Sequence, residues 1–145
     1  FDPLRDRVLM IESPAESVHV WSHKARIVLF LSAMRHFSDL LRRRGWPVSY
    51  RAGDDPAPAA SLADGLLAAI SEYAPDRVVA CEPGELRVRE LIEQACRSAG
   101  VRLDLRPDAH FLCSSAEFAD WAGKRKTLRM EFFYRDMRRR HGILL

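Results

Sequence analysis

Cysteine is scarce in this chain, and its three cysteines, Cys81, Cys96 and Cys113, lie far apart. No two of them have the C-x-x-C spacing of a zinc ribbon or a thioredoxin-type motif. An odd, dispersed set is typical of reduced thiols in the core of a cytosolic protein. We therefore expect no disulfide framework, no metal bound by these cysteines, and a cytoplasmic location.

Long apolar runs are also missing from the chain. No segment approaches the roughly 18–20 consecutive apolar residues that a membrane span needs. The first ten residues, FDPLRDRVLM, lack the basic start and the apolar stretch of a signal peptide. The sequence thus predicts a protein with no membrane partner.

Three sequence motifs that identify common catalytic or nucleotide-binding folds are absent as well. The chain has neither G-x-G-x-x-G nor G-x-x-x-x-G-K-[ST], which cradle the phosphates of dinucleotides and nucleoside triphosphates. It also lacks the G-x-S-x-G elbow that presents a nucleophilic serine in α/β-hydrolases. These absences disfavour a dinucleotide enzyme, a P-loop protein and a hydrolase.

The 145 residues, 48% hydrophobic and 30% charged, are enough for one domain with a core of its own. The net charge of +3 is distributed unevenly. From Lys124 onward there are eight Lys/Arg and two Asp/Glu, whereas residues 1–123 hold 15 Lys/Arg and 18 Asp/Glu, a net −3. The basic character therefore belongs to the C-terminal segment, which indicates a polyanion or a partner surface there rather than a generally basic protein.

Short apolar runs alternate with helical stripes along the chain. Strands are expected at residues 7–13, 47–53, 76–84 and 101–108. Helices are expected at about residues 22–44, 62–73, 88–99 and 126–140. A further short helix is expected to start at a capping box formed by Ser114 and Glu117. Strands separated by helices pair in parallel through right-handed crossovers. The pattern predicts an α/β domain with a Rossmann-like, doubly wound, mostly parallel sheet flanked by helices.

Ligands of such sheets collect beyond the carboxyl ends of the strands, where three stretches are candidates. Residues 12–24, taken as a loop, could hold a flat heterocycle, with a solvated loop as the alternative. Residues 82–87 could bind an anion at a helix N-terminus, with a plain strand-to-helix turn as the alternative. In residues 106–115, Asp108, His110 and Ser114 have the residue types of a catalytic triad but lack the elbow that it needs.

The C-terminal segment is the most unusual part of the sequence. If residues 126–140 are helical, Met130, Phe133, Tyr134 and Met137 form one stripe, with arginines around it. Arginine pairs with phosphates and stacks on rings, so the helix could bind a nucleic acid. The alternative is an ordinary amphipathic helix docked on the sheet.

Several motifs together resemble one family. The stretches SAMRHF, EPGE-x-R and RK-x-L-x-MEFFYR-x-MRR occur in this order in the chain. They resemble the N-terminal part of the photolyase-related proteins of bacteria, which are the iron–sulfur bacterial cryptochromes and prokaryotic (6-4) photolyases. The resemblance covers nearly the whole chain.

This resemblance implies an antenna-type α/β domain at residues 1–123 and a basic connector helix at residues 124–145. The connector is expected to lead to a C-terminal helical domain that is absent here and that binds FAD and a 4Fe–4S cluster. The parent protein would be a light-driven DNA lyase or a blue-light photoreceptor, which meets DNA through that other domain. The chain by itself would not be catalytic.

The resemblance also implies a site for the antenna chromophore 6,7-dimethyl-8-ribityllumazine. The family's loop reads roughly E-x-x-Y-x-x-H-H-K, and Glu16, His23 and Lys24 match it. His19 replaces the aromatic residue, and Ser22 replaces the first histidine of the pair. Phe30 stands at a helix position that lines the family's pocket.

One departure concerns a strand that the family carries ahead of these residues, reading like LILGDQL. It is missing here, and in the family it would lie in the middle of the sheet and form a wall of the antenna pocket. Two other interpretations stay open. One is a standalone Rossmann-like module that binds a nucleotide or a nucleic acid, and the other is a remnant without activity.

Overall fold

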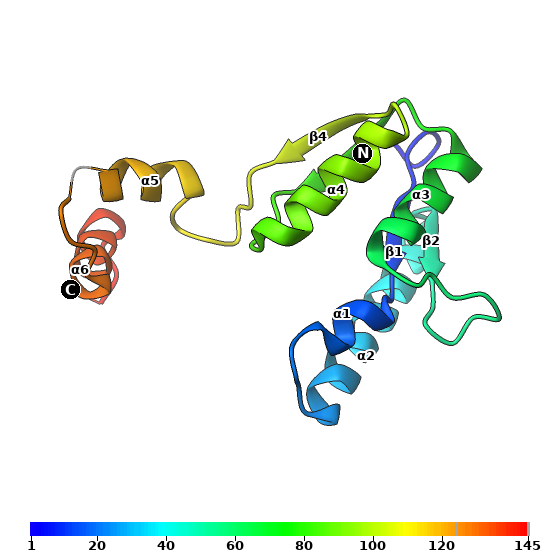
Figure 1. The fold of residues 1–145 in the computed structure, drawn as a ribbon, viewed down its shortest axis with the longest axis horizontal. Helices are drawn as coiled ribbons and strands as arrows, with labels where there is room; N and C mark the ends of the chain where they lie inside the picture. The colour runs from blue at the N-terminus through cyan, green and yellow to red at the C-terminus, as the bar shows by residue number, and fades with distance from the viewer. Residues whose placement is uncertain (124, 145) are drawn as a thin grey trace.

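The computed structural model describes residues 1–123 and 125–144, and Figure 1 shows their arrangement. The elements in chain order are β1 Val8–Ile11, α1 Pro14–His19, α2 Lys24–Arg43, β2 Val48–Arg51, α3 Leu62–Tyr73, β3 Arg77–Cys81, α4 Leu86–Ser98, β4 Arg102–Arg106, α5 Ser115–Gly123 and α6 Met130–His141. Parallel strands alternate with helices, which confirms the predicted α/β fold class. None of the described helices is both long and apolar enough to cross a membrane.

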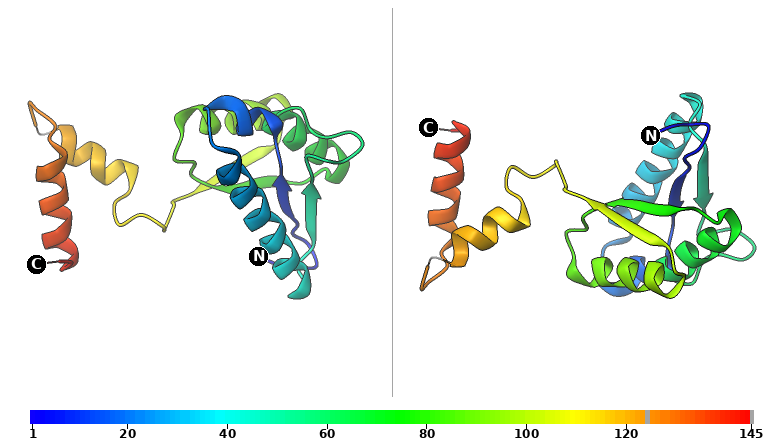
Figure 2. Two further views of the ribbon diagram at one scale, coloured as in Figure 1. Left: turned by 90° about the horizontal axis from the view of Figure 1, so that it is seen from below. Right: turned by 90° about the horizontal axis from the view of Figure 1, so that it is seen from above.

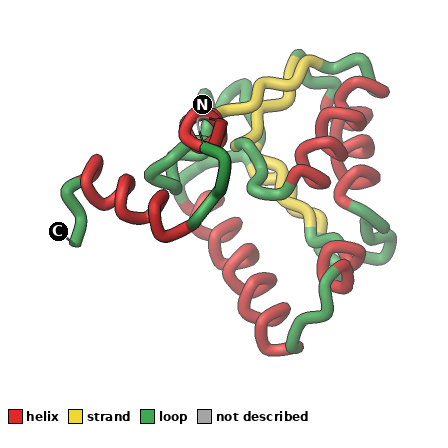
Figure 3. Tube along the Cα trace, turned by 60° about the vertical axis from the view of Figure 1, so that its left-hand side comes forward, coloured by secondary structure: helices red, strands yellow, loops and turns green. Residues whose placement is uncertain are grey.

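The strands form two parallel pairs. In one pair Val8 of β1 lies opposite Val48 of β2, and in the other Arg77 of β3 lies opposite Arg102 of β4. Among the described residues the pairs are separate two-stranded sheets, as Figure 3 shows. Because β1 and β3 are each hydrogen-bonded to a strand on one side only, the separation is compatible with a sheet that lacks its middle strand.

The core lies between the strands and the helices α3 and α4. Its buried residues are Leu66, Ile70, Ala95 and Cys96, with Leu9, Ile11, Val78, Ile92, Val101 and Leu103 packed against them. Figure 2 shows α2 on one side of the strands and α3 and α4 on the other, the layering of a doubly wound domain. Gly65 lets α3 approach β1, because a Cβ atom at this position would lie 2.9 Å from Cγ2 of Ile11.

The expectation that cysteines belong to the core holds for one of the three. Cys96 is 1% exposed, and burial raises the pKa of its thiol. Cys81 is exposed at the end of β3, and Cys113 is half-buried. Cys81 does not reach the core because residues 77, 79 and 81 of β3 point away from it in alternation with 78 and 80.

The expected loop at residues 12–24 contains a helix, α1. Pro14 is its first residue. Proline is favoured at this position because a backbone N–H there would have no acceptor within the helix. Six residues are too few to show a 3.6-residue apolar stripe, so the pattern alone does not reveal this helix.

The capping box predicted for α5 is confirmed. The backbone N–H of Glu117 donates to Oγ of Ser114 at 3.2 Å, and the N–H of Ser114 donates to Oε2 of Glu117 at 2.8 Å. The last helix begins at Met130 rather than near residue 126, because Arg129 is extended at φ −120° and ψ 121°. Lys124 and Leu145, the first and last residues of the expected connector, lie outside the described residues.

The helices α5 and α6 pack on each other through three aromatic rings. The ring of Phe133 lies edge-on to both Phe118 and Trp121, with 5.1 Å between ring centroids in each case. Figures 1 and 2 show this helical pair standing apart from the strands at the end of an extended segment. The alternative in which the last helix docks on the sheet is therefore wrong in this structure.

Candidate functional site

A buried carboxylate lies where β1 ends. Glu12 is 3% exposed and accepts two hydrogen bonds from Arg35, at 2.6 and 2.8 Å. The hydroxyl of Tyr50 and the backbone N–H of Gly53 also donate to it, at 2.5 and 2.8 Å. Arg35 reaches on to Asp54 at 2.8 Å. The cluster ties α2 to the ends of β1 and β2.

The electrostatics of this cluster follow from its hydrogen bonds. Those from Arg35, Tyr50 and Gly53 lower the pKa of Glu12 to about 2 against the opposing effect of burial. Burial, together with the hydrogen bond to Glu12, raises the pKa of Tyr50 to about 12. Glu12 is thus ionised near neutral pH, and both of its carboxylate oxygens accept hydrogen bonds. This suits a structural role and not that of a general base.

Glu16, expected to contact the chromophore, is held by an arginine of α4. Its carboxylate oxygens accept from Arg87 at 2.9 and 2.6 Å, and Arg87 also pairs with Glu85 at 3.1 Å. The hydrogen bond from Arg87 lowers the pKa of Glu16. Since α1 follows β1 and α4 follows β3, this ion pair connects the carboxyl ends of the two strand pairs.

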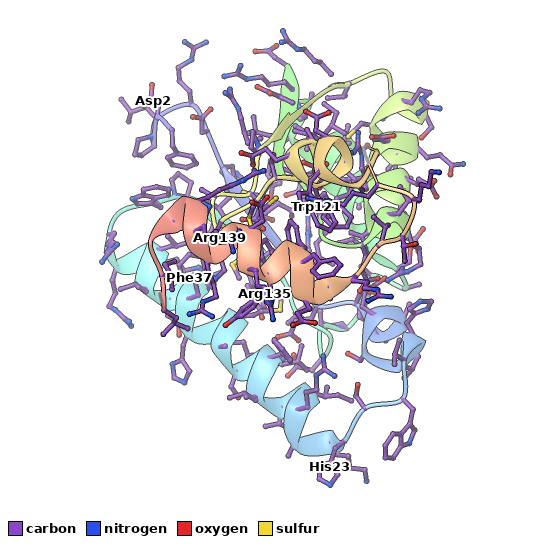
Figure 4. The ribbon with its side chains drawn as sticks, turned by 90° about the vertical axis from the view of Figure 1, so that its left-hand side faces the viewer. Asp2, His23, Phe37, Trp121, Arg135 and Arg139 are labelled. Atoms are coloured by element: carbon purple, nitrogen blue, oxygen red, sulfur yellow. The ribbon has the colours of Figure 1, made fainter. Side chains whose placement is uncertain are left out.

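The next three expected side chains lie at the junction of α1 and α2. His19 is the last residue of α1, and Lys24 is the first of α2. His23 caps α2, since its Nδ1 accepts from the N–H of Ala25 at 3.1 Å. In this arrangement Nε2 of His23 carries the proton and is the free donor, and Figure 4 shows His23 at the outer end of α2.

Phe30 lies on the exposed side of α2. It is 57% exposed, and the guanidinium of Arg26 lies 5.6 Å from its ring centroid. Two shallow hollows lie elsewhere, along α5 and α6. The role of the five expected side chains, Glu16, His19, His23, Lys24 and Phe30, stays a prediction.

The other two candidate stretches serve local structure. At residues 82–87, Glu82 and Glu85 pair with Arg89 and Arg87, so carboxylates flank the start of α4 and the plain turn is the better interpretation. After β4, the N–H of His110 donates to Asp108 at 2.8 Å. The described residues contain no cluster of three or more groups suited to hold a metal ion.

Sequence reasoning missed the arginine partners of Glu12 and Glu16. Arg35 lies inside the SAMRHF stretch, on the side of α2 that also carries Leu31 one turn earlier. An arginine beside the apolar stripe of a helix is a signal for a buried acidic partner. Arg87 gave a weaker signal, because nothing in its surroundings singles out a partner 71 residues away.

Comparison with known proteins bears on the whole chain. The model of the family described as deoxyribodipyrimidine photo-lyase-related protein matches residues 1–145. The chain belongs to this family. It is 41% identical over 144 residues to a (6-4) photolyase of Agrobacterium fabrum (strain C58 / ATCC 33970), and it matches the N-terminal part of that protein. The match covers 99% of this chain and 28% of the relative, so the chain spans little more than a quarter of the relative's length.

Proposed function

We propose that this chain is the N-terminal antenna and docking domain of a photolyase-related flavoprotein. The observation that carries the proposal is the 41% identity over 99% of the chain to a (6-4) photolyase of which it covers 28%. FAD, a 4Fe–4S cluster and the contact with DNA lesions then belong to a C-terminal helical domain. The parent is a light-driven DNA lyase or a blue-light photoreceptor in the cytoplasm, and this domain is not catalytic on its own.

The antenna chromophore of this proposal is 6,7-dimethyl-8-ribityllumazine. Its ring presents N–H and carbonyl groups at the edge, and its ribityl chain presents hydroxyls. The chain offers a carboxylate acceptor in Glu16, donors in Lys24 and in Nε2 of His23, and a ring for stacking in Phe30, with His19 beside them on α1. These residue types fit the chromophore, and Arg87 holds Glu16 in one orientation.

A strand between β1 and β3 completes the proposed domain. Each of these strands has a partner on one side only among the described residues. A parallel strand inserted there gives the spatial order β2-β1-insert-β3-β4, in which the inserted strand lies where the crossovers change direction. Doubly wound domains bind their ligands at the carboxyl end of that position. The inserted strand would form the missing wall of the antenna site.

Titration with the chromophore tests the antenna function. The full-length protein and this chain are titrated with 6,7-dimethyl-8-ribityllumazine, and the fluorescence of the chromophore is followed. We expect binding that weakens in Glu16→Gln and Lys24→Gln, while Glu90→Gln on α4 leaves it unchanged as a matched control. Absence of any fluorescence change at tens of micromolar with the full-length protein contradicts the antenna function.

A standalone binding module is the second candidate. It is favoured by the basic helix α6, which together with α5 stands apart from the strands (Figure 1). The gene on both sides of this segment separates the two candidates. An upstream strand ending in GDQL and a downstream set of four cysteines support the flavoprotein, and an open reading frame confined to these residues supports the module.

A further inference from the structure

Helix α6 exposes two different faces on opposite sides. At about 100° per residue, Met130, Tyr134 and Met137 lie on one side of the helix, and Phe132, Arg135 and Arg139 lie on the other. Met130 and Tyr134 are 73% and 51% exposed, and Phe132 is 45% exposed. The ring of Phe133 between the two faces packs against α5. If the C-terminal helical domain of the parent docks on the apolar side of α6, the arginine side therefore stays accessible.

The arginine side forms a shallow hollow. It is lined by Arg125, Phe132, Arg135, Asp136 and Arg139, and we call these residues the arginine face. Figure 4 shows Arg135 and Arg139 along α6, one helical turn apart. Because the pair of helices stands away from the strands, no described residue of the α/β body covers this face.

The ion pairs leave the arginine face with an excess of positive charge. Asp136 pairs with Arg140 at 2.9 Å, and Arg135 pairs with Glu131 at 2.6 Å. Within residues 1–123 and 125–144, Arg125 and Arg139 make no ion pair with a carboxylate. Two guanidinium groups are thus available to an anion.

Aromatic rings orient the guanidinium group of Arg125 and that of Arg129, which lies beside the arginine face. The guanidinium of Arg125 lies 4.2 Å from the ring centroid of Trp121, a side chain that is only 6% exposed. That of Arg129 lies 5.8 Å from the centroid of Phe132. A guanidinium stacked through its flat side keeps the N–H groups at its edge free to bind phosphate oxygens.

From these observations we infer that the arginine face binds single-stranded nucleic acid, with Arg125 and Arg139 on phosphates and Phe132 stacked on a base. Grooves that bind single strands combine positive charge along the backbone with exposed rings for the bases, and both are present here. This contact goes beyond the proposed function, which places DNA on the other domain of the parent. The result of the chromophore titration neither supports nor contradicts this nucleic-acid contact.

Fluorescence anisotropy of a labelled 15-nucleotide oligo-dT, measured with this chain over a range of salt concentrations, tests the inference. Each phosphate contact on a single strand contributes about 0.7 to the slope of log affinity against log salt. The double variant Arg125→Gln/Arg139→Gln should therefore lower the magnitude of the slope by about 1.4. The control pair Arg43→Gln/Arg97→Gln, which removes the same charge from α2 and α4, should leave the slope unchanged.

The stacking contact has its own readout. Phe132→Ala should weaken oligo-dT binding roughly 5- to 150-fold, the range for one stacked base. Far-UV circular dichroism checks that each variant keeps its helices. If the control pair Arg43→Gln/Arg97→Gln lowers the salt slope as much as the double variant does, the attraction is unspecific and the inference is overturned. Tighter binding of a DNA duplex or of poly-glutamate than of oligo-dT would assign the face to another partner and overturn it too.

Discussion

Removal of the buried charge at the end of β1 is the most informative perturbation of the α/β body. Glu12→Gln keeps the size of the side chain but places an amide among donors from Arg35, Tyr50 and Gly53. The native environment lowers the pKa of Glu12 from 4.5 to about 2. At 1.36 kcal/mol for each pKa unit, this corresponds to about 3 kcal/mol of stability at pH 7. Broken buried ion pairs cost a similar amount.

The same lowered pKa fixes how the effect depends on pH. Because folding lowers the pKa of Glu12, its charge stabilises the native state fully above pH 4.5, and the contribution disappears as the pH falls toward 2. The difference in unfolding free energy between wild type and Glu12→Gln should thus shrink from about 3 kcal/mol at pH 7 to less than half of that value at pH 3.

Urea denaturation followed by far-UV circular dichroism measures both values. Asp54→Asn is the matched control, since its carboxylate also pairs with Arg35 but is 72% exposed, and an exposed pair is worth less than about 1 kcal/mol. Equal losses of unfolding free energy in Glu12→Gln and Asp54→Asn would refute the reasoning, because the burial of Glu12 would then have no effect. A difference that stays constant between pH 7 and pH 3 would refute the assignment of the effect to the charge of Glu12.

Three further perturbations follow from local geometry, and each can be read from thermal or urea unfolding. Gly65→Ala should cost about 1–3 kcal/mol, since its Cβ meets Ile11, whereas Gly84→Ala, with nothing within 4 Å, should be nearly neutral. Ala74→Gly should stabilise by about 1 kcal/mol, because Ala74 is left-handed at φ 42°; an unchanged melting temperature would contradict this. Phe133→Ala should cost about 2 kcal/mol or more and shift the fluorescence of Trp121 to longer wavelength, and unchanged emission would show that the three rings do not pack in solution.

The parts of the fold that the sequence predicts are those that repeat at a fixed spacing. The expected helix at residues 62–73 coincides with α3, because its leucines and isoleucine recur at steps of three and four and Ser61 caps it. The start of α6 could not be predicted in this way. Residues 126–128 are as compatible with a helix as those that follow, and the extended backbone of Arg129 is what delays the helix.

The chemistry of the candidate site was less accessible to sequence reasoning, for a different reason. Glu12 and Arg35 are 23 positions apart, and Glu16 and Arg87 are 71 apart. Such pairs depend on how crossovers bring elements together, and no local period encodes them. The motifs nonetheless contained both arginines, since SAMRHF includes Arg35 and EPGE-x-R ends on Arg87. The residues were therefore visible in the motifs, while their partners were not.

The separation of the two strand pairs changes what holds the α/β body together. No backbone hydrogen bonds join β1 to β3 in the described residues, so the pairs are connected through side chains. Helix α3 packs on Ile11 of β1 through the gap left by Gly65, and its Leu66 and Ile70 share one core cluster with Cys96 of α4. The Glu16–Arg87 ion pair adds a second connection at the carboxyl ends. Apolar packing of α3 is the stronger of the two, because Glu16 and Arg87 are each about one-third exposed and such pairs contribute little. The relative position of the strand pairs, and with it the geometry of any site between them, therefore depends chiefly on the close approach of α3 to β1.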